Sequence, residues 1–162
     1  ALKGENMNIF VVDKDPKIAA TMLCDKHVVK MIVETAQMLC TAANALGHQD
    51  TPYRPTHKKH PCTLWTAESK ANWDWLIEHG LEMCAEYTRR YGRRHKTQDV
   101  IEWCRNSGAG PMSGSLTPFR LAMPPQYKCS DPVKSYRSYY IGEKARIAKW
   151  KTRPPSWWPP TI

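Results

Sequence analysis

The sequence lacks the features that most readily assign a chain to a functional class. No apolar run approaches the roughly 18 residues that a membrane-spanning helix needs. No Walker A, GxGxxG, GxSxG or HExxH pattern occurs, which argues against kinases, dinucleotide-binding enzymes and the common serine and zinc hydrolases. Internal repeats and the polar–apolar alternation of half-buried strands are also missing. These absences predict a compact all-α protein.

Cysteine pairs of the CxxC type are missing as well, although the chain of 162 residues holds six cysteines. Single, scattered cysteines in a chain of this length predict buried, reduced thiols in a cytoplasmic protein rather than a disulfide framework. His57, His60 and Cys62 are potential metal ligands, but a zinc site needs a second ligand pair at a recognisable spacing. We therefore expect no metal ion and no other cofactor, and we assign His57 and His60 to phosphate contacts in a basic loop.

Acidic residues are scarce relative to basic ones, so the formal net charge is +9. The excess is concentrated in residues 133–153, 89–96 and 54–59. Any one of these blocks fits a solvated helix face, but three blocks interleaved with Tyr and Trp favour a polyanion, most simply nucleic acid. A membrane surface is disfavoured because the basic segments lack a clean apolar opposite face. We expect a monomer that binds double-stranded DNA and has no membrane partner.

The phosphate contacts expected from the second basic block are those of Arg89, Arg90, Arg93, Arg94 and His95. In His95 a phosphate contact is favoured over a catalytic base, because basic residues stand on both sides of it.

Helix signals divide the chain into a few long elements. Asp15 suits a helix N-cap and Pro16 the first helical position, while Gly92 suits the residue that ends a helix. The expected helices cover residues 16–46, 62–91 with a break near Ser69, 100–105 and a basic C-terminal helix at 132–150. Loops are expected at 47–61 and 106–118, and prolines predict an extended Pro/Trp tail at 151–162. We expect a single helical domain over residues 1–162, of which residues 1–6 are a short extension.

Polar side chains recur along the first expected helix, which is otherwise apolar. His27, Lys30, Glu34, Gln37 and Thr41 follow one another at steps of three and four, so they share one face. Ionisable groups in an apolar setting are costly unless they pair, face a cleft or do chemistry. Glu34 is a candidate general acid/base or stabiliser of a cationic transition state, with Lys30 as its partner or as a nucleophilic amine and His27 as a third catalytic group. The alternative is a buried ion pair that closes a helix–helix contact.

Two adjacent tryptophans, Trp157 and Trp158, stand between prolines near the end of the chain. The prolines hold them in extended chain, where stacking on a base and packing into a groove of the same domain agree equally with the sequence. The tyrosines at 136, 139 and 140 fit the core side of the preceding helix, because positions 136 and 140 share a face.

Several short motifs occur in the order in which a known enzyme family has them. They are Leu23-Cys24-Asp25-Lys26-His27 followed by Glu34 seven residues after the histidine, His60-Pro61 before the second long helix, the arginine-rich residues 87–95, and Arg153-Pro154-x-Ser156-Trp157-Trp158 near the end. Through these motifs the chain resembles the pyrimidine-dimer DNA glycosylases of the phage and bacterial endonuclease V type. The resemblance extends thinly over most of the chain.

That resemblance implies a helical fold that kinks duplex DNA and displaces a base. The family removes a damaged pyrimidine and then cuts the strand by β-elimination, and its nucleophile is the α-amine of a processed N-terminal residue, which attacks the sugar C1′ and forms an imine. The residue that matches the family's catalytic glutamate is Glu34, which would stabilise the oxocarbenium-like sugar and assist elimination. The resemblance also implies DNA contacts for Lys26, His27, Arg153, Trp157 and Trp158.

The chain departs from the family pattern at the amine and beside the glutamate. Met7-Asn8 takes the place of the family's first residues, and Val33 and Gln37 stand where the family has arginines. We keep Gln37 as an expected substrate contact. Lys30, one helical turn before Glu34, replaces the amine if burial lowers its pKa.

These observations together predict a DNA N-glycosylase with AP lyase activity, acting on a damaged or modified pyrimidine in duplex DNA. We expect a cytoplasmic, nucleoid-associated protein, encoded by a phage and expressed in its bacterial host. Two alternatives stay open: a phage-type enzyme that modifies a flipped pyrimidine on the same scaffold, and a DNA-binding protein without enzymatic activity in which Glu34 is structural.

Overall fold

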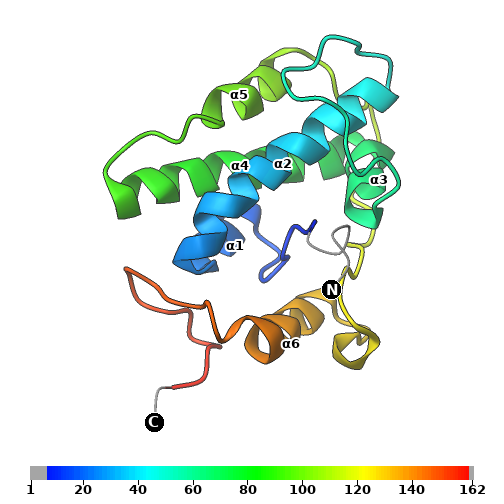
Figure 1. The fold of residues 1–162 in the computed structure, drawn as a ribbon. Helices are drawn as coiled ribbons and strands as arrows, with labels where there is room; N and C mark the ends of the chain where they lie inside the picture. The colour runs from blue at the N-terminus through cyan, green and yellow to red at the C-terminus, as the bar shows by residue number, and fades with distance from the viewer. Residues whose placement is uncertain (1–6, 161–162) are drawn as a thin grey trace.

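The computed structural model describes residues 7–160, which form six α-helices and one short 3₁₀ helix without any strand (Figure 1). The elements are α1 (Pro16–Met22), α2 (Asp25–Ala45), α3 (Pro61–Glu68), α4 (Lys70–Tyr91), α5 (Gln98–Asn106), η2 (Pro125–Tyr127) and α6 (Pro132–Lys144). The all-α prediction is confirmed. The extension predicted at 1–6 and the last two residues of the tail lie outside the described residues, and the single-domain organisation stays a prediction.

Helix α4 is the element on which the other helices of the N-terminal part pack. It contacts α1, α2, α3 and α5, and Trp73, Trp75, Leu76 and Met83 are among the residues that it buries. The helix α2 lies across it, and these two helices are the longest of the described residues, with 21 and 22 residues (Figure 1). They are the two long helices that the sequence predicts.

The predicted helix boundaries are confirmed where a side chain or a glycine sets them. The Asp15 carboxylate accepts hydrogen bonds from the backbone N–H groups of Lys17 and Ile18 at the start of α1. Ser69 separates α3 from α4, and its hydroxyl accepts from the N–H of Asn72. Gly92 ends α4 with a φ of 70°, a left-handed conformation that glycine adopts without a steric cost.

The helix predicted over residues 16–46 is instead two helices, separated at Leu23 and Cys24. No Gly or Pro lies at this break. Contacts with residues far along the chain cause it. The Cys24 N–H donates to the Tyr140 hydroxyl at 3.0 Å, and the Leu23 carbonyl accepts from Arg90 at 2.8 Å. A continuous helix would use both backbone groups internally.

Helix α6 ends at Lys144, short of the predicted end at residue 150. The chain beyond α6 turns back to the start of α2, where the Lys149 carbonyl accepts a hydrogen bond of 2.8 Å from the N–H of Asp25. The prediction of a longer helix is therefore wrong, since the backbone of this segment bonds to another element.

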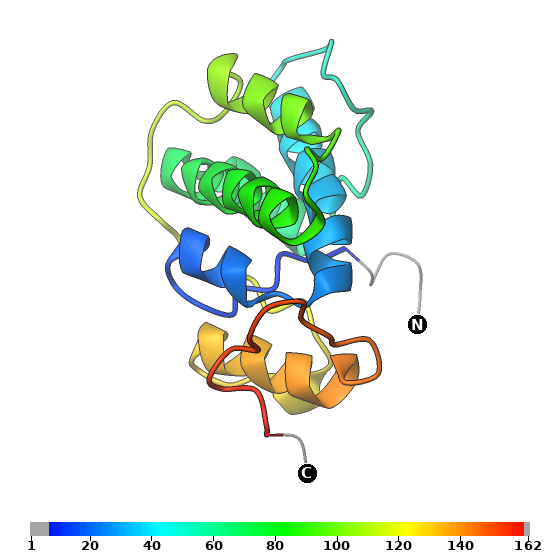
Figure 2. The same cartoon turned by 90° about the vertical axis from the view of Figure 1, so that its left-hand side faces the viewer.

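Residues 7–12 form extended chain between the α2/α4 layer and α6, and all six are buried (Figures 1 and 2). The Phe10 ring stacks on His27 with centroids 4.5 Å apart and packs edge-on against Tyr140 at 5.4 Å. Phe10 has a φ of 57°, which is uncommon for a residue other than glycine. The Asn8 side chain supports this turn, because its Oδ1 accepts from the N–H groups of Ile9 and Phe10.

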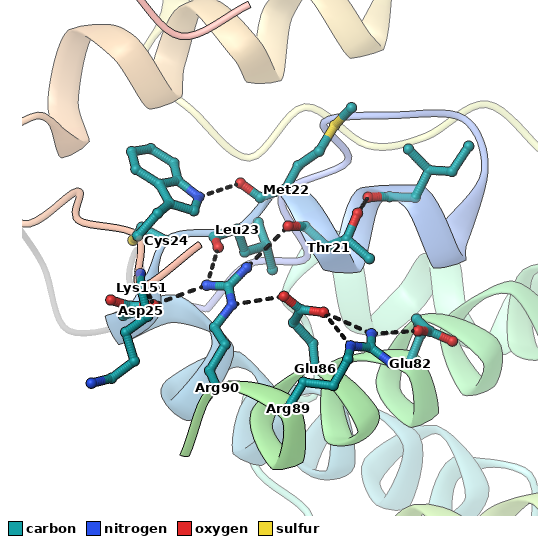
Figure 3. A network of polar contacts seen from close by, with 12 residues as sticks. Thr21, Met22, Leu23, Cys24, Asp25, Glu82, Glu86, Arg89, Arg90 and Lys151 are labelled. Atoms are coloured by element: carbon teal, nitrogen blue, oxygen red, sulfur yellow. Dashed lines mark hydrogen bonds and ion pairs between the residues drawn. The ribbon is translucent and has the colours of Figure 1, made fainter. Parts of the chain in front are cut away.

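Arg90 lies inside the protein and joins α4 to the junction of α1 and α2 (Figure 3). Its Nε donates to Glu86 at 2.7 Å, and its terminal nitrogens donate to the carbonyls of Thr21 and Leu23 and to Asp25. The side chain has no exposed surface. We therefore no longer expect Arg90 to contact phosphate, because a fully buried guanidinium cannot reach DNA.

The same junction anchors the chain that follows α6. Asp25, which accepts from Arg90, also accepts from the N–H of Lys151 at 3.1 Å (Figure 3). The Trp150 indole donates to the carbonyl of Met22 at 3.0 Å. Arg90 thus supports both the start of α2 and the first part of the tail.

We predict that Arg90→Met destabilises the protein by about 3 to 5 kcal/mol, because it removes the buried partner of the Glu86 Oε2 and of Asp25 together with the donor to the carbonyls of Thr21 and Leu23. Urea unfolding measures this loss. The matched control is Arg89→Met, which removes a half-exposed guanidinium that also contacts Glu86 and should cost less than about 1 kcal/mol. Equal losses for the two variants would contradict the structural role of Arg90.

We also predict that Gly110→Ala destabilises the fold by about 1 to 3 kcal/mol through overpacking. A Cβ at Gly110 would lie 2.5 Å from the indole ring of the buried Trp73. Thermal unfolding would show a lower midpoint, while Ser115→Ala in the same loop, at an exposed position, should leave the midpoint close to that of the wild type.

Candidate active site

Glu34 lies on the polar face of α2, buried beneath the segment of residues 7–12. Its Oε1 accepts a hydrogen bond of 3.0 Å from the Asn8 N–H, and its Oε2 lies 3.7 Å from the Lys30 Nζ. The Glu34 side chain is 8% exposed, whereas that of Lys30 is 57% exposed. Burial raises the pKa of Glu34 to about 7, against the opposing effects of the Asn8 N–H and the Lys30 charge. This carboxyl group can therefore both hold and release a proton near neutral pH.

His27 is brought to the same place, but it is packed as a core residue. Its Nδ1 lies 2.8 Å from the Tyr140 hydroxyl, and its ring stacks on Phe10. Burial lowers the pKa of His27 to about 3, and the charges of Lys144 and Lys30 add to this shift. The imidazole is thus neutral near pH 7, and its contacts hold Phe10 in position between α2 and α6.

Lys144, the last residue of α6, completes the charged group around Glu34, and sequence reasoning missed it. Its Nζ lies 5.7 Å from the ring centroid of Phe10 and 5.2 Å from that of Tyr139. The residue is half-buried, and burial followed by the charge of Lys30 lowers its pKa. The only available signal was its place in the basic C-terminal block, which marks no single lysine.

The two histidines of the 57–62 segment have different positions. His60 caps α3 by accepting from the Cys62 N–H at 3.1 Å, and its ring also bonds to the backbone of Met7, next to Asn8. His57 is exposed, with its Nδ1 3.0 Å from the Thr56 hydroxyl. Within residues 7–160, no three potential metal ligands of the His, Cys, Asp or Glu type lie together. His60 therefore belongs to the frame of the Glu34 site, whereas His57 lies on the surface.

Two of the basic blocks converge on the first turns of α2. The backbone of Lys149 and Lys151 bonds to Asp25, next to the exposed Lys26. From the segment after α4, the His95 ring donates to the Val29 carbonyl at 3.2 Å. None of the helices among residues 7–160 has the combination of length and apolar character that crossing a bilayer requires. The contacts with Asp25 and Val29 thus gather basic residues of two blocks at the start of α2, next to Lys30.

The arginines of the 89–94 block differ in how much of their charge is already paired. Arg89 pairs with Glu82 and Glu86. Arg94 pairs with Asp99 and Glu102. Arg93 is exposed and donates to the Tyr87 hydroxyl at 3.0 Å, and no carboxylate pairs with it within residues 7–160. Arg93 is consequently the member of the block best placed to meet a phosphate.

The two tail tryptophans pack against the domain and stay partly exposed. The Trp157 indole donates to the Met22 sulfur at 3.3 Å, and the Arg137 guanidinium lies 5.5 Å from its ring centroid. Trp158 packs edge-on against Trp150, with centroids 5.0 Å apart, and both line an open hollow beside the prolines of the tail. Both indoles therefore pack into the same domain while staying half-buried, and Arg153 is exposed; stacking of either tryptophan on a base stays a prediction.

The raised pKa of Glu34 has a consequence for stability. The folded protein holds its proton between the usual 4.5 and about 7, where the unfolded chain releases it, so this residue destabilises the fold increasingly as the pH rises through that range. His27 and His79 have the opposite effect on stability. Burial lowers their pKa values from 6.5 to about 3 and about 4, so below pH 6.5 the unfolded chain binds protons that the folded protein does not, and stability falls as the pH falls. The effect of Glu34 on stability is therefore obtained by comparing the wild type with a variant at this position.

We predict that Glu34→Gln becomes more stable relative to the wild type by on the order of 2 kcal/mol from pH 5 to pH 8, because the amide has no charge to desolvate. Urea unfolding of both proteins across this range measures the difference, from which the common histidine effect cancels. A difference that does not change with pH would contradict the shifted pKa of Glu34.

Comparison with known proteins found one family profile that matches the chain. The profile of the pyrimidine dimer DNA glycosylase family matches residues 7–99, which is more than half of the chain and includes Asn8, His27, Lys30 and Glu34. Comparisons with curated proteins and with solved structures gave no match. The matched range and the buried glutamate within it lead to one conclusion: the chain belongs to the pyrimidine dimer DNA glycosylase family.

Proposed function

We propose that this protein is a DNA N-glycosylase with AP lyase activity, which releases a damaged or modified pyrimidine from double-stranded DNA. The observation that carries the proposal is Glu34, a buried carboxyl group with a pKa near neutrality and two lysines in its surroundings, in a chain of a DNA glycosylase family. Groups of this kind suit proton transfer at physiological pH.

In the proposed reaction Glu34 acts twice. As a carboxylate it stabilises the positive charge that develops on the sugar when the bond between C1′ and the base breaks. In the following elimination it takes up and returns protons at the sugar, since its pKa of about 7 lets both forms coexist. His27 is a positioning residue, because its neutral ring is stacked inside the protein on Phe10.

DNA would lie on the basic surface at the start of α2. We assign phosphate contacts to Lys26, Lys30, Arg93 and Lys151, which are exposed and belong to three different segments. The Lys151 Nζ lies 5.2 Å from the ring centroid of Tyr91, so this part of the tail packs against the end of α4. We assign Gln37, half-buried one turn after Glu34, to the edge of the reaction site, and Trp158 and Arg153 to outer contacts.

Glu34→Gln is predicted to lower the rate of base release from a duplex with one thymine dimer by at least about 100-fold, because the amide neither carries charge nor transfers a proton. DNA affinity and its salt dependence should stay near those of the wild type, since Glu34 is not part of the phosphate-binding surface. The matched control is Glu78→Gln, an exposed position on α4.

Base release by Glu34→Gln within a few-fold of the wild type would refute the proposed role of the glutamate. A base that is altered in mass but stays attached to the DNA would identify the base-modifying alternative instead. Salt-dependent binding by the wild type without any reaction on the dimer or on an abasic site would identify a DNA-binding protein without this activity.

A further inference from the structure

The loop that joins α2 to α3 carries arginine and lysine side chains that no carboxylate balances (Figure 1). Arg54, Lys58 and Lys59 are exposed, and none of them forms an ion pair within residues 7–160. Cations that lie close together without anions repel one another. This part of the surface is therefore suited to an anionic partner.

Two contacts fix the position of this loop relative to Glu34, and the first lies on α2. The Thr41 hydroxyl accepts a hydrogen bond of 2.9 Å from the N–H of Thr56 and donates to the carbonyl of the same residue at 3.1 Å. Thr41 follows Glu34 by seven residues, which is two turns or about 10 Å along the helix. Residues with this spacing share a face, so the loop joins the polar face that carries Glu34.

The second contact links the end of the loop to the segment that covers Glu34. The His60 ring bonds to the backbone of Met7. The next residue, Asn8, donates its N–H to the Glu34 Oε1 at 3.0 Å. Since Lys59 directly precedes His60, the basic loop ends beside the covering segment of the carboxyl group.

The basic part of the loop is held on both sides. Before it, the Tyr53 hydroxyl lies 2.7 Å from that of Thr97, in the segment that follows α4. After it, the His57 carbonyl accepts from the N–H of His60 at 3.1 Å, which closes a turn around the two lysines. The loop is thus bound to α2, to the segment after α4 and to the N-terminal segment.

We propose that the loop of residues 54–59 is a second phosphate-binding surface, which contacts the duplex on the side of Glu34 opposite to Lys26; this inference rests on the function proposed above. Lys26 precedes Glu34 on α2, and the loop contact at Thr41 follows it. From Lys26 to Thr41 the helix spans about 22 Å, which corresponds to about six phosphates along one strand.

Phosphate contacts on both sides of the reacting nucleotide suit an enzyme that acts on a displaced base. A base leaves the stack only if the backbone on either side of it allows the nucleotide to rotate outward. Contacts at the start of α2 and at the loop would hold the flanking phosphates while the nucleotide between them turns toward Glu34. Because phosphate contacts carry no sequence information, the loop would act in any sequence around the damaged base.

Salt-dependent binding of a duplex with one reduced abasic site tests the surface. The variant is Lys58→Gln with Lys59→Gln, and the matched control is Lys14→Gln with Lys17→Gln, exposed lysines at the start of α1. We expect the loop variant to lose about 1.8 from the slope of log K against log salt, and about tenfold in affinity, because two phosphate contacts are lost. The control should change the slope by less than about 0.5.

Lys58→Arg with Lys59→Arg keeps the two charges, and it should bind within about twofold of the wild type with the same slope. Thermal unfolding shows whether each variant is folded. Loss of affinity in this charge-keeping variant would overturn the proposal, because it would show that the lysines act through the structure of the loop.

Shortened duplexes test on which side of the reacting nucleotide the loop lies. The contact at Thr41 is about three phosphates from Glu34, so a duplex cut to about two base pairs beyond the abasic site no longer reaches the loop. Two such duplexes are compared, one cut on each side of the abasic site. We expect one of them to bind the wild type and the variant Lys58→Gln with Lys59→Gln equally, while the other keeps the full difference between them.

An unchanged salt slope in the loop variant, or an equal change in the control, would overturn the proposal. A difference between wild type and loop variant that persists in both shortened duplexes would overturn it too, since the loop would then bind away from the flank of the reacting nucleotide. The function proposed above fails separately. If the wild type releases no base from a duplex with a thymine dimer, the glycosylase proposal is refuted even where the loop contributes to DNA binding as expected.

Discussion

A buried guanidinium determines where the parts of this protein meet. Arg90, on the central helix α4, binds the last carbonyls of α1 and the first carboxylate of α2, and this carboxylate in turn binds the chain that follows α6. Because a buried charge must keep its partners, these segments cannot shift independently of one another. The direction in which α2 leaves the junction, and with it the place of Glu34, depends on this contact.

The site itself depends on a second constraint, the burial of residues 7–12 between two helical layers. Asn8 brings a backbone N–H to Glu34, and Phe10 brings a ring to His27 on one side and to α6 on the other. Burial raises the pKa of the carboxyl group and lowers that of Lys144, so the same packing brings both groups closer to neutral pH. The raised pKa of Glu34 lowers stability near neutral pH, which is the kind of perturbation that marks a candidate active site.

Much of this arrangement could be predicted because it is local. Caps at Asp15 and Ser69 and the glycine at 92 act within one helical turn, and the residues that share a face of α2 follow from helical periodicity alone. The break after Leu23 and the early end of α6 could not be predicted in this way. Both arise where backbone groups bond to side chains or backbone far along the chain, which no local pattern encodes.

The sequence by itself determined an all-helical chain, an excess of positive charge, the polar face that carries Glu34, and motifs that resemble a DNA glycosylase family. Tertiary structure alone decided which charges stay available. It buried Arg90 and left Arg93 exposed within one block of arginines, and it placed the Lys144 Nζ over the rings of Phe10 and Tyr139. The physical reason is that a charge gains its role from burial and from its neighbours in space, and neighbours in space are settled only when the helices pack.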